Sequence, residues 1–141
     1  MMTDIDKLIS QTIHITKYVA AANAQSFEER TATILQFHTL SFLAENPNAK
    51  QSDVAKHLTA SLSSTTQLID RMYKAGFIER KGDENDRRVI LLSVTKEGLK
   101  KLKHMKEAKR ERMKELLLNL TKEEVNQLIA IQEKILTNIH K

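Results

Sequence analysis

The chain has 141 residues, the length of one ordinary domain, and 40% of them are hydrophobic while 29% are charged, so it can bury a core of its own. Lys and Arg number 23 against 18 Asp and Glu, and the formal net charge of +5 favours a polyanionic partner. The absence of cysteine excludes disulfides, thiol catalysis and cysteine-ligated zinc. No apolar run reaches the roughly 20 residues of a membrane span, and the acidic start lacks a basic signal segment, so we expect a cytoplasmic protein.

Apolar residues recur at the spacing of an amphipathic helix from the start of the chain. This spacing predicts a first helix over roughly the first twenty residues. The positions that carry it are Ile5, Leu8, Ile9, Thr12, Ile15 and Val19. A second helix is expected over residues 29–44, apolar on most sides and therefore central and buried. Asn46, Pro47 and Asn48 stop it, because proline cannot continue a helix.

Two shorter helices are expected over residues 52–58 and 62–75. Ser61 is the expected N-cap of the second, and Gly76 stands where a left-handed residue would end it. The period then changes, because residues 77–80 and 89–94 are apolar and rich in β-branched side chains. They flank a polar stretch, so we predict a two-stranded hairpin with a charged loop.

Two helices complete the chain. Thr95 is the expected cap of a long helix over residues 96–118, and Thr121 with Glu124 forms a capping box for the last. Its apolar stripe comprises Val125, Leu128, Ile131, Ile135 and Ile139. The expected fold class is mainly α with a small β-hairpin.

Two short helices followed by a hairpin are the pattern of a winged helix-turn-helix domain. At about 100° per residue, the second short helix turns an inner face of Thr65, Leu68, Ile69 and Met72 toward the preceding helix. Its outer face carries Ser63, Ser64, Gln67, Asp70, Arg71 and Lys74. Gln can bind adenine and Arg guanine in a major groove. An ordinary solvated helix face is the alternative interpretation.

The hairpin loop, residues 82–88, places Arg87 and Arg88 side by side. Such a tip can insert a guanidinium into the narrow minor groove, with Asp86 holding one arginine as an intramolecular brace. The alternative is a mixed-charge turn that keeps the strands soluble, which the three acidic residues of the loop favour.

These segments resemble the MarR family of bacterial transcriptional regulators. The resemblance rests on residues 53–58, 61–71, 76–80, 83–88 and 92–98 and covers essentially the whole chain, with the acidic-then-arginine wing as its most specific part. It implies a homodimer joined by the first and last helices that binds pseudo-palindromic DNA. It also implies a recognition helix over residues 62–74 and a minor-groove role for Arg88. The chain departs from the family at Lys50, where a capping Thr or Ser is common and Asn48 or Ser52 would have to substitute, at Thr59, where Gly is usual, and at Gln67, where Arg is frequent.

The expected organisation is a helical dimerisation region, residues 1–30 and 112–141, and a winged helix-turn-helix domain, residues 31–111. The expected DNA-contacting residues of the recognition helix are Ser61, Ser63, Ser64, Thr66, Gln67, Arg71 and Lys74. Those of the wing are Arg80, Lys81, Asp86, Arg87 and Arg88. A candidate pocket for a small-molecule effector lies at His14, Lys17 and His38, although ordinary core or surface roles are the alternative for each. The basic run over residues 96–114 fits a solvated helix face, with DNA contact at its first turns as the alternative.

We therefore expect a sequence-specific transcriptional regulator, in repressor mode, with no cofactor, no metal and no membrane partner. No nucleophile elbow, phosphate-binding loop or metal-ligand spacing occurs, so we expect no enzymatic activity. The alternative function is a winged-helix adaptor that docks proteins without reading DNA sequence.

Overall fold

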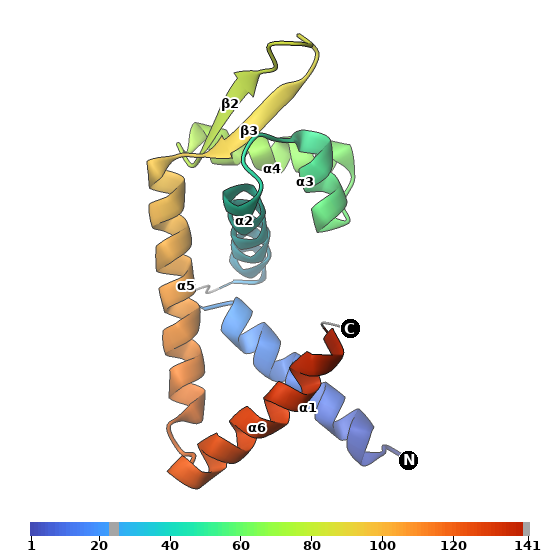
Figure 1. The fold of residues 1–141 in the computed structure, drawn as a ribbon, viewed down its shortest axis with the longest axis vertical. Helices are drawn as coiled ribbons and strands as arrows, with labels where there is room; N and C mark the ends of the chain where they lie inside the picture. Colours follow the sequence, from blue (N-terminus) through green and yellow to red (C-terminus); the bar gives the residue numbers. More distant parts are fainter. Residues whose placement is uncertain (23–25, 140–141) are drawn as a thin grey trace.

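The structure is a computed structural model and describes residues 1–22 and 26–139. In this part of the chain six helices and three short strands form an elongated molecule, with the hairpin at one end and the two terminal helices at the other (Figure 1). The elements are α1 (Asp4–Ala20), α2 (Phe27–Glu45), β1 (Ala49–Lys50), α3 (Gln51–Leu58), α4 (Leu62–Lys74), β2 (Ile78–Gly82), β3 (Ile90–Val94), α5 (Lys96–Leu117) and α6 (Lys122–Ile139).

The predicted helices are confirmed, and their first turns are capped as the sequence indicates. Ser61 accepts a hydrogen bond from the amide of Ser64, and Thr95 accepts one from the amide of Gly98. Thr121 and Glu124 exchange both bonds of the predicted capping box. Gly76 has a φ of 85°, so it is the left-handed residue that follows α4. Local hydroxyl and glycine signals therefore fix where these helices begin and end.

The start of α3 differs from the sequence expectation. Its N-cap position is Lys50, and neither Asn48 nor Ser52 takes that place. The backbone amide of Lys50 donates to the Asp53 carboxylate over 2.9 Å. An acidic residue three positions into the helix thus satisfies the backbone amide of the N-cap residue, which is one of the two bonds of a capping box.

The sheet has one strand more than the predicted hairpin. Strand β3 lies between β1 and β2, and both neighbours pair with it antiparallel. Ala49 is opposite Leu92, and Lys50 is opposite Leu91. A strand of two residues carries no period of its own, so only the fold reveals it. The third strand ties the base of the wing to the end of α2.

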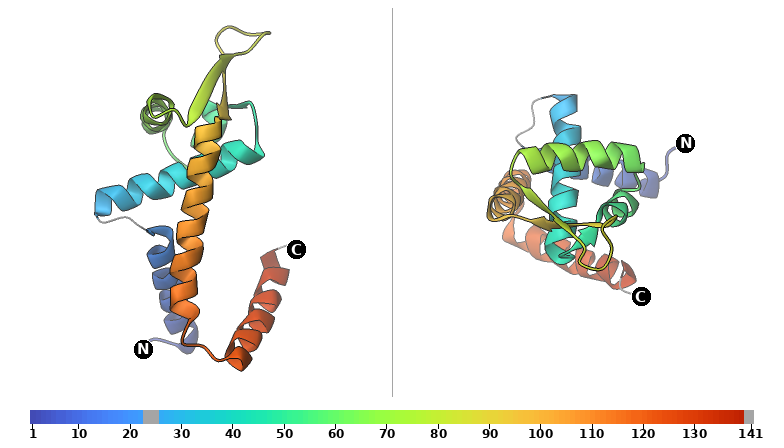
Figure 2. Two further views of the ribbon diagram at one scale, coloured as in Figure 1. Left: turned by 90° about the vertical axis from the view of Figure 1, so that its left-hand side faces the viewer. Right: turned by 90° about the horizontal axis from the view of Figure 1, so that it is seen from above.

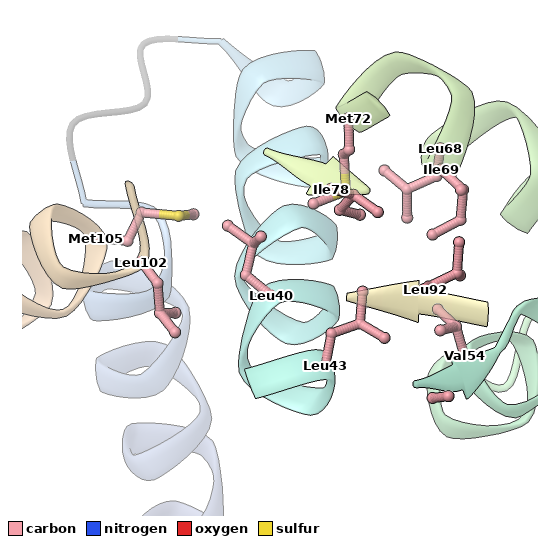
Figure 3. Packing of buried hydrophobic residues seen from close by; sticks show 11 residues of the cluster. Leu40, Leu43, Val54, Leu68, Ile69, Met72, Ile78, Leu92, Leu102 and Met105 are labelled. Carbon is pink, nitrogen blue, oxygen red and sulfur yellow. The ribbon is translucent and has the colours of Figure 1, made fainter. Parts of the chain in front are cut away.

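The core surrounds α2, as the sequence predicts. Leu40 and Leu43 are fully buried. The side of the core formed by α3, α4 and the sheet adds Val54, Leu68, Ile69, Met72, Ile78 and Leu92, and α5 adds Leu102 and Met105 (Figure 3). A single apolar cluster therefore joins the helix-turn-helix, the hairpin and the long helix into one body.

The terminal helices leave their apolar faces uncovered. Helix α1 lies against α5, whereas α6 turns back from the far end of α5 (Figure 2). No residue of α1 or of the described α6 is buried. The large exposed hydrophobic side chains are Ile5, Leu8, Ile9, Ile13, Ile15 and Tyr18 on α1 and Val125, Ile129, Ile131, Ile135, Leu136 and Ile139 on α6. Across residues 1–22 and 26–139, none of the helices is long and apolar enough to cross a membrane.

Replacing Gly98 by alanine is expected to lower the free energy of unfolding by about 1–3 kcal/mol, the usual cost of overfilling a packed site. The new Cβ would overlap the carbonyl oxygen of Phe77 and lie 2.6 Å from Cγ1 of Val94. Urea unfolding followed by circular dichroism measures the change.

Gly82→Ala is the matched control. Apart from its chain neighbours, no atom of the described structure lies within 4 Å of the Cβ that this substitution adds. We expect a change below about 0.5 kcal/mol, as for other surface sites. Equal losses in the two variants would contradict the close-approach argument.

Candidate nucleic-acid interface

The turn between α3 and α4 sets the angle of the two helices. Thr59 has a φ of 52° and a ψ of 44°, the left-handed conformation, and the amide of Ala60 donates to the carbonyl of Ala55. This geometry ends α3 and delivers the chain to Ser61. A β-branched residue rarely adopts it, so Thr59 carries strain that the glycine usual at this position would avoid.

Helix α4 separates an inner face from an outer face as its period predicts. Thr65, Leu68, Ile69 and Met72 are its buried residues. The hydroxyl, amide and basic side chains of the predicted recognition surface are exposed, namely Ser61, Ser63, Ser64, Thr66, Gln67, Arg71 and Lys74. This helix lies beside the hairpin, at the end of the molecule away from α1 and α6 (Figures 1 and 2).

A contact between α3 and α4 supports the start of this surface. The side-chain Nε2 of Gln51 donates to the hydroxyl of Thr66, and that hydroxyl donates to the backbone carbonyl of Leu62. The Thr66 hydroxyl is therefore hydrogen-bonded within the protein, although the residue is exposed. Sequence reasoning missed Gln51, because a pairing across fifteen residues leaves no local signal.

Another pair connects α4 with the hairpin. The guanidinium of Arg80, on β2, donates a hydrogen bond to the carboxylate of Asp70 and lies 4.5 Å from the ring centre of Tyr73. This hydrogen bond holds the pKa of Asp70 below its usual value, so the group is a carboxylate at neutral pH. Arg80, expected to contact DNA, is thus engaged by α4.

The tip of the wing presents Arg88 in a braced arrangement. The Asp86 carboxylate accepts from the amide of Arg88 over 3.0 Å and from its Nε over 3.3 Å. The predicted brace is therefore present, although the Arg88 side chain stays 91% exposed. Arg87 and Lys81 are exposed beside it. Asp86 binds the Nε of Arg88, and the rest of this guanidinium is open to solvent and can reach a DNA groove.

The candidate effector residues His14, Lys17 and His38 lie on two different helices. His14 and Lys17 are exposed on α1, and the His38 ring lies edge-on to Phe37. Burial, followed by the charges of Lys109 and His57, lowers the pKa of His38, so its imidazole is neutral at pH 7. An effector site at these three residues stays a prediction.

A cavity of about 190 Å³ lies instead between the end of α1, α2 and α5. Its lining residues are Ala20, Ala22, Thr33, Gln36, Lys101, His104, Met105, Ala108 and Lys109. These include two lysines and a histidine and no carboxylate. The Lys109 amine lies 3.3 Å from the ring centre of Phe37, and burial lowers its pKa. The lining therefore suits a small anion.

The chain matches a known family over this region. The family model described as MarR family covers residues 32–90, which run from α2 to the start of β3. The HTH-type transcriptional repressor MdtR of Bacillus subtilis (strain 168) is 32% identical over 111 residues, covering 79% of this chain and 72% of the repressor.

Solved structures share the whole architecture. The crystal structure of the YusO protein from Bacillus subtilis superposes with a TM-score of 0.76 at 28% identity, covering 96% of this chain and 94% of that one. Streptococcus pneumoniae FabT in complex with DNA gives a TM-score of 0.70 at 25% identity, covering 96% and 92%. The similarity thus includes the terminal helices as well as the central domain.

Thr59→Gly is expected to raise the free energy of unfolding by about 1 kcal/mol. The left-handed conformation costs an L-residue roughly 1–2 kcal/mol, and the added freedom of glycine in the unfolded chain returns part of the gain. Thermal and urea unfolding measure the difference.

Asn48→Gly serves as the control for this substitution. Asn48 has a φ of 64°, but asparagine tolerates the left-handed region. We expect a change of a few tenths of a kcal/mol at most, about the scatter of surface substitutions. A Thr59 variant no more stable than the parent would contradict the strain.

Proposed function

The chain belongs to the MarR family of winged helix-turn-helix transcriptional regulators, and on that premise we propose that it is a repressor that binds a pseudo-palindromic operator as a homodimer. Membership in this family also confirms the expectation that the chain is not an enzyme. The observation that carries the proposal is the exposed polar face of α4 next to the braced, open guanidinium of Arg88.

The two elements suit two different grooves. In the proposed complex α4 enters the major groove, where Ser63, Gln67 and Arg71 contact base edges. Arg88 enters the adjacent minor groove, whose negative potential attracts a guanidinium. Phosphate contacts would come from the exposed Lys and hydroxyl groups around them, which supply affinity without sequence information. The remaining candidates for that role are Ser61, Ser64, Thr66, Lys74, Lys81 and Arg87.

The exposed apolar faces of α1 and α6 support a homodimer. Isolated hydrophobic side chains on a surface are ordinary, but two helices that each expose six large ones favour association. In the proposed division, residues 1–30 and 112–141 dimerise and residues 31–111 bind DNA. Two-fold symmetry then places the recognition helices about one turn of DNA apart, roughly 34–36 Å.

We also propose that a small organic anion in the cavity between α1, α2 and α5 regulates operator binding. Lys101, His104 and Lys109 converge there without a carboxylate. The cavity lies where the end of α1 meets α2 and α5, so an occupant would bias the spacing of the two wings.

The first experiment measures binding to labelled duplex from upstream of the chain's own gene, by fluorescence anisotropy between 50 and 300 mM salt. We expect one dimer per site, a steep decrease of affinity with salt and much weaker binding to a scrambled duplex. Binding of neither duplex at low salt would overturn the proposal and favour the winged-helix adaptor, whose docking on an apolar surface would be insensitive to salt.

Arg88→Ala is expected to weaken operator binding by about 1–3 kcal/mol, since it removes the proposed minor-groove contact. Arg110→Ala, in the distal half of α5, removes the same charge far from the wing and should change affinity by less than about twofold. Equal effects of both substitutions would show that only net charge matters, and the role of the wing would then be wrong.

Benzoate is the probe for the cavity, with neutral benzamide as its matched control. We expect benzoate, but not benzamide, to raise the melting temperature of the free protein and to weaken operator binding, because the lining is cationic. Lys109→Met removes one charge and should abolish both effects. A benzoate response that persists in this variant would place the anion elsewhere.

A further inference from the structure

An acidic residue stands on the very face of α4 that the proposed function turns toward DNA. Asp70 lies between Gln67 and Lys74 on the outer surface, and its side chain is 46% exposed. A carboxylate at this place would repel phosphate unless a cation compensates for it. Arg80 of β2 and Lys74, whose Nζ lies 4.0 Å from the carboxylate, are the two cations that face it.

The contact with Arg80 is more than a compensating charge. The Arg80 side chain is only 29% exposed, and its guanidinium lies on the ring of Tyr73, one turn from Asp70. Tyr73 and Asp70 thus form a binding site on α4 for the Arg80 guanidinium. Arginine fits such a site because its planar guanidinium can stack on an aromatic ring and donate hydrogen bonds to a carboxylate at the same time.

This contact closes a short loop in the chain. A short connection that contains the left-handed Gly76 leads from α4 to β2. Within the sheet, Arg80 of β2 is paired with Leu92 of β3. The side-chain contact therefore joins the recognition helix to the hairpin at a second place besides the connecting backbone. The ion pair thus adds a side-chain attachment to the backbone connection and the apolar core that already join α4 to the hairpin.

We propose that Asp70 and Arg80 are positioning residues: their ion pair, seated on Tyr73, fixes the angle between the recognition helix and the wing, and neither residue contacts DNA. The inference rests on the proposed function, in which α4 and Arg88 enter neighbouring grooves at the same time. If the distance between α4 and Arg88 is fixed before binding, the complex does not lose conformational entropy in fixing it. The Asp70–Arg80 ion pair thus contributes to operator recognition through geometry.

Asp70→Asn separates geometry from charge, because the two predict changes of opposite sign. The substitution removes a negative charge, so electrostatics alone would tighten binding to every duplex. The positioning role predicts that operator binding weakens about 5- to 30-fold while scrambled duplex is bound as well as before or better. The measured quantity is the ratio of the two affinities, at several salt concentrations.

Glu79→Gln is the matched control, since it removes one negative charge from an exposed residue adjacent to Arg80 in the same strand. We expect its affinity ratio to equal that of the parent. Arg80→Lys keeps the charge but not the planar fork, so it should lower the ratio as Asp70→Asn does. Melting temperatures of all variants verify that each one is folded.

A double-mutant cycle with Arg88→Ala gives the second readout. If Asp70 positions the wing, Arg88→Ala should cost less in the Asp70→Asn background than in the parent, because the wing is already misplaced. Additive effects, or an Asp70→Asn variant with an unchanged or improved affinity ratio, would overturn the positioning role while sequence-specific binding by the parent stands. A parent that fails to distinguish operator from scrambled duplex overturns the proposed function, and this inference with it.

Discussion

The junction between the hairpin and the long helix positions the base of the wing. The carbonyl of Phe77 accepts a hydrogen bond from the amide of Thr95 and lies against Gly98. The Thr95 hydroxyl donates to the carbonyl of Gly76 and accepts from the amide of Gly98. One threonine and one glycine of α5 therefore hold the backbone that leaves α4 and enters β2. The close approach requires a residue without a Cβ at position 98, so the same glycine that weakens a helix in general stabilises this fold.

Charge on the candidate interface is organised by pairing. On α4 Asp70 pairs with Arg80, and in the wing loop Asp86 pairs with Arg88. The consequences of the two pairs differ. Arg80 is largely covered by its contacts, whereas Arg88 keeps its outer surface open. Pairing thus decides which basic side chains of this surface remain available to a polyanion. The net charge of +5 alone does not identify them.

The local elements could be predicted from the sequence because their signals are local. Hydroxyl caps at Ser61 and Thr95, the left-handed Gly76 and the period of α4 each depend on residues within one or two turns. Strand β1, the contact of Gln51 with Thr66 and the engagement of Arg80 by Asp70 depend on residues that the fold brings together. Periodicity identifies which face of a helix is exposed, but it does not identify which exposed groups are already paired. The sequence therefore does not distinguish Arg80, whose guanidinium is paired with Asp70, from Arg88, whose side chain stays open to solvent.

Helix α5 provides the mechanical link between the terminal helices and the wing. It is one continuous helix of 22 residues, about 33 Å long at 1.5 Å per residue. One end holds the hairpin through Thr95 and Gly98, and the other leads to the exposed leucines that precede α6. Lys101 and Lys109 line the cavity between these ends. On the proposed function, an anion favours whichever arrangement of α1 and α2 against α5 encloses it closest to these ammonium groups, because the attraction between opposite charges increases at shorter separation. A rigid helix transfers that preference to the wing, and only a difference in anion affinity between two arrangements can shift operator binding.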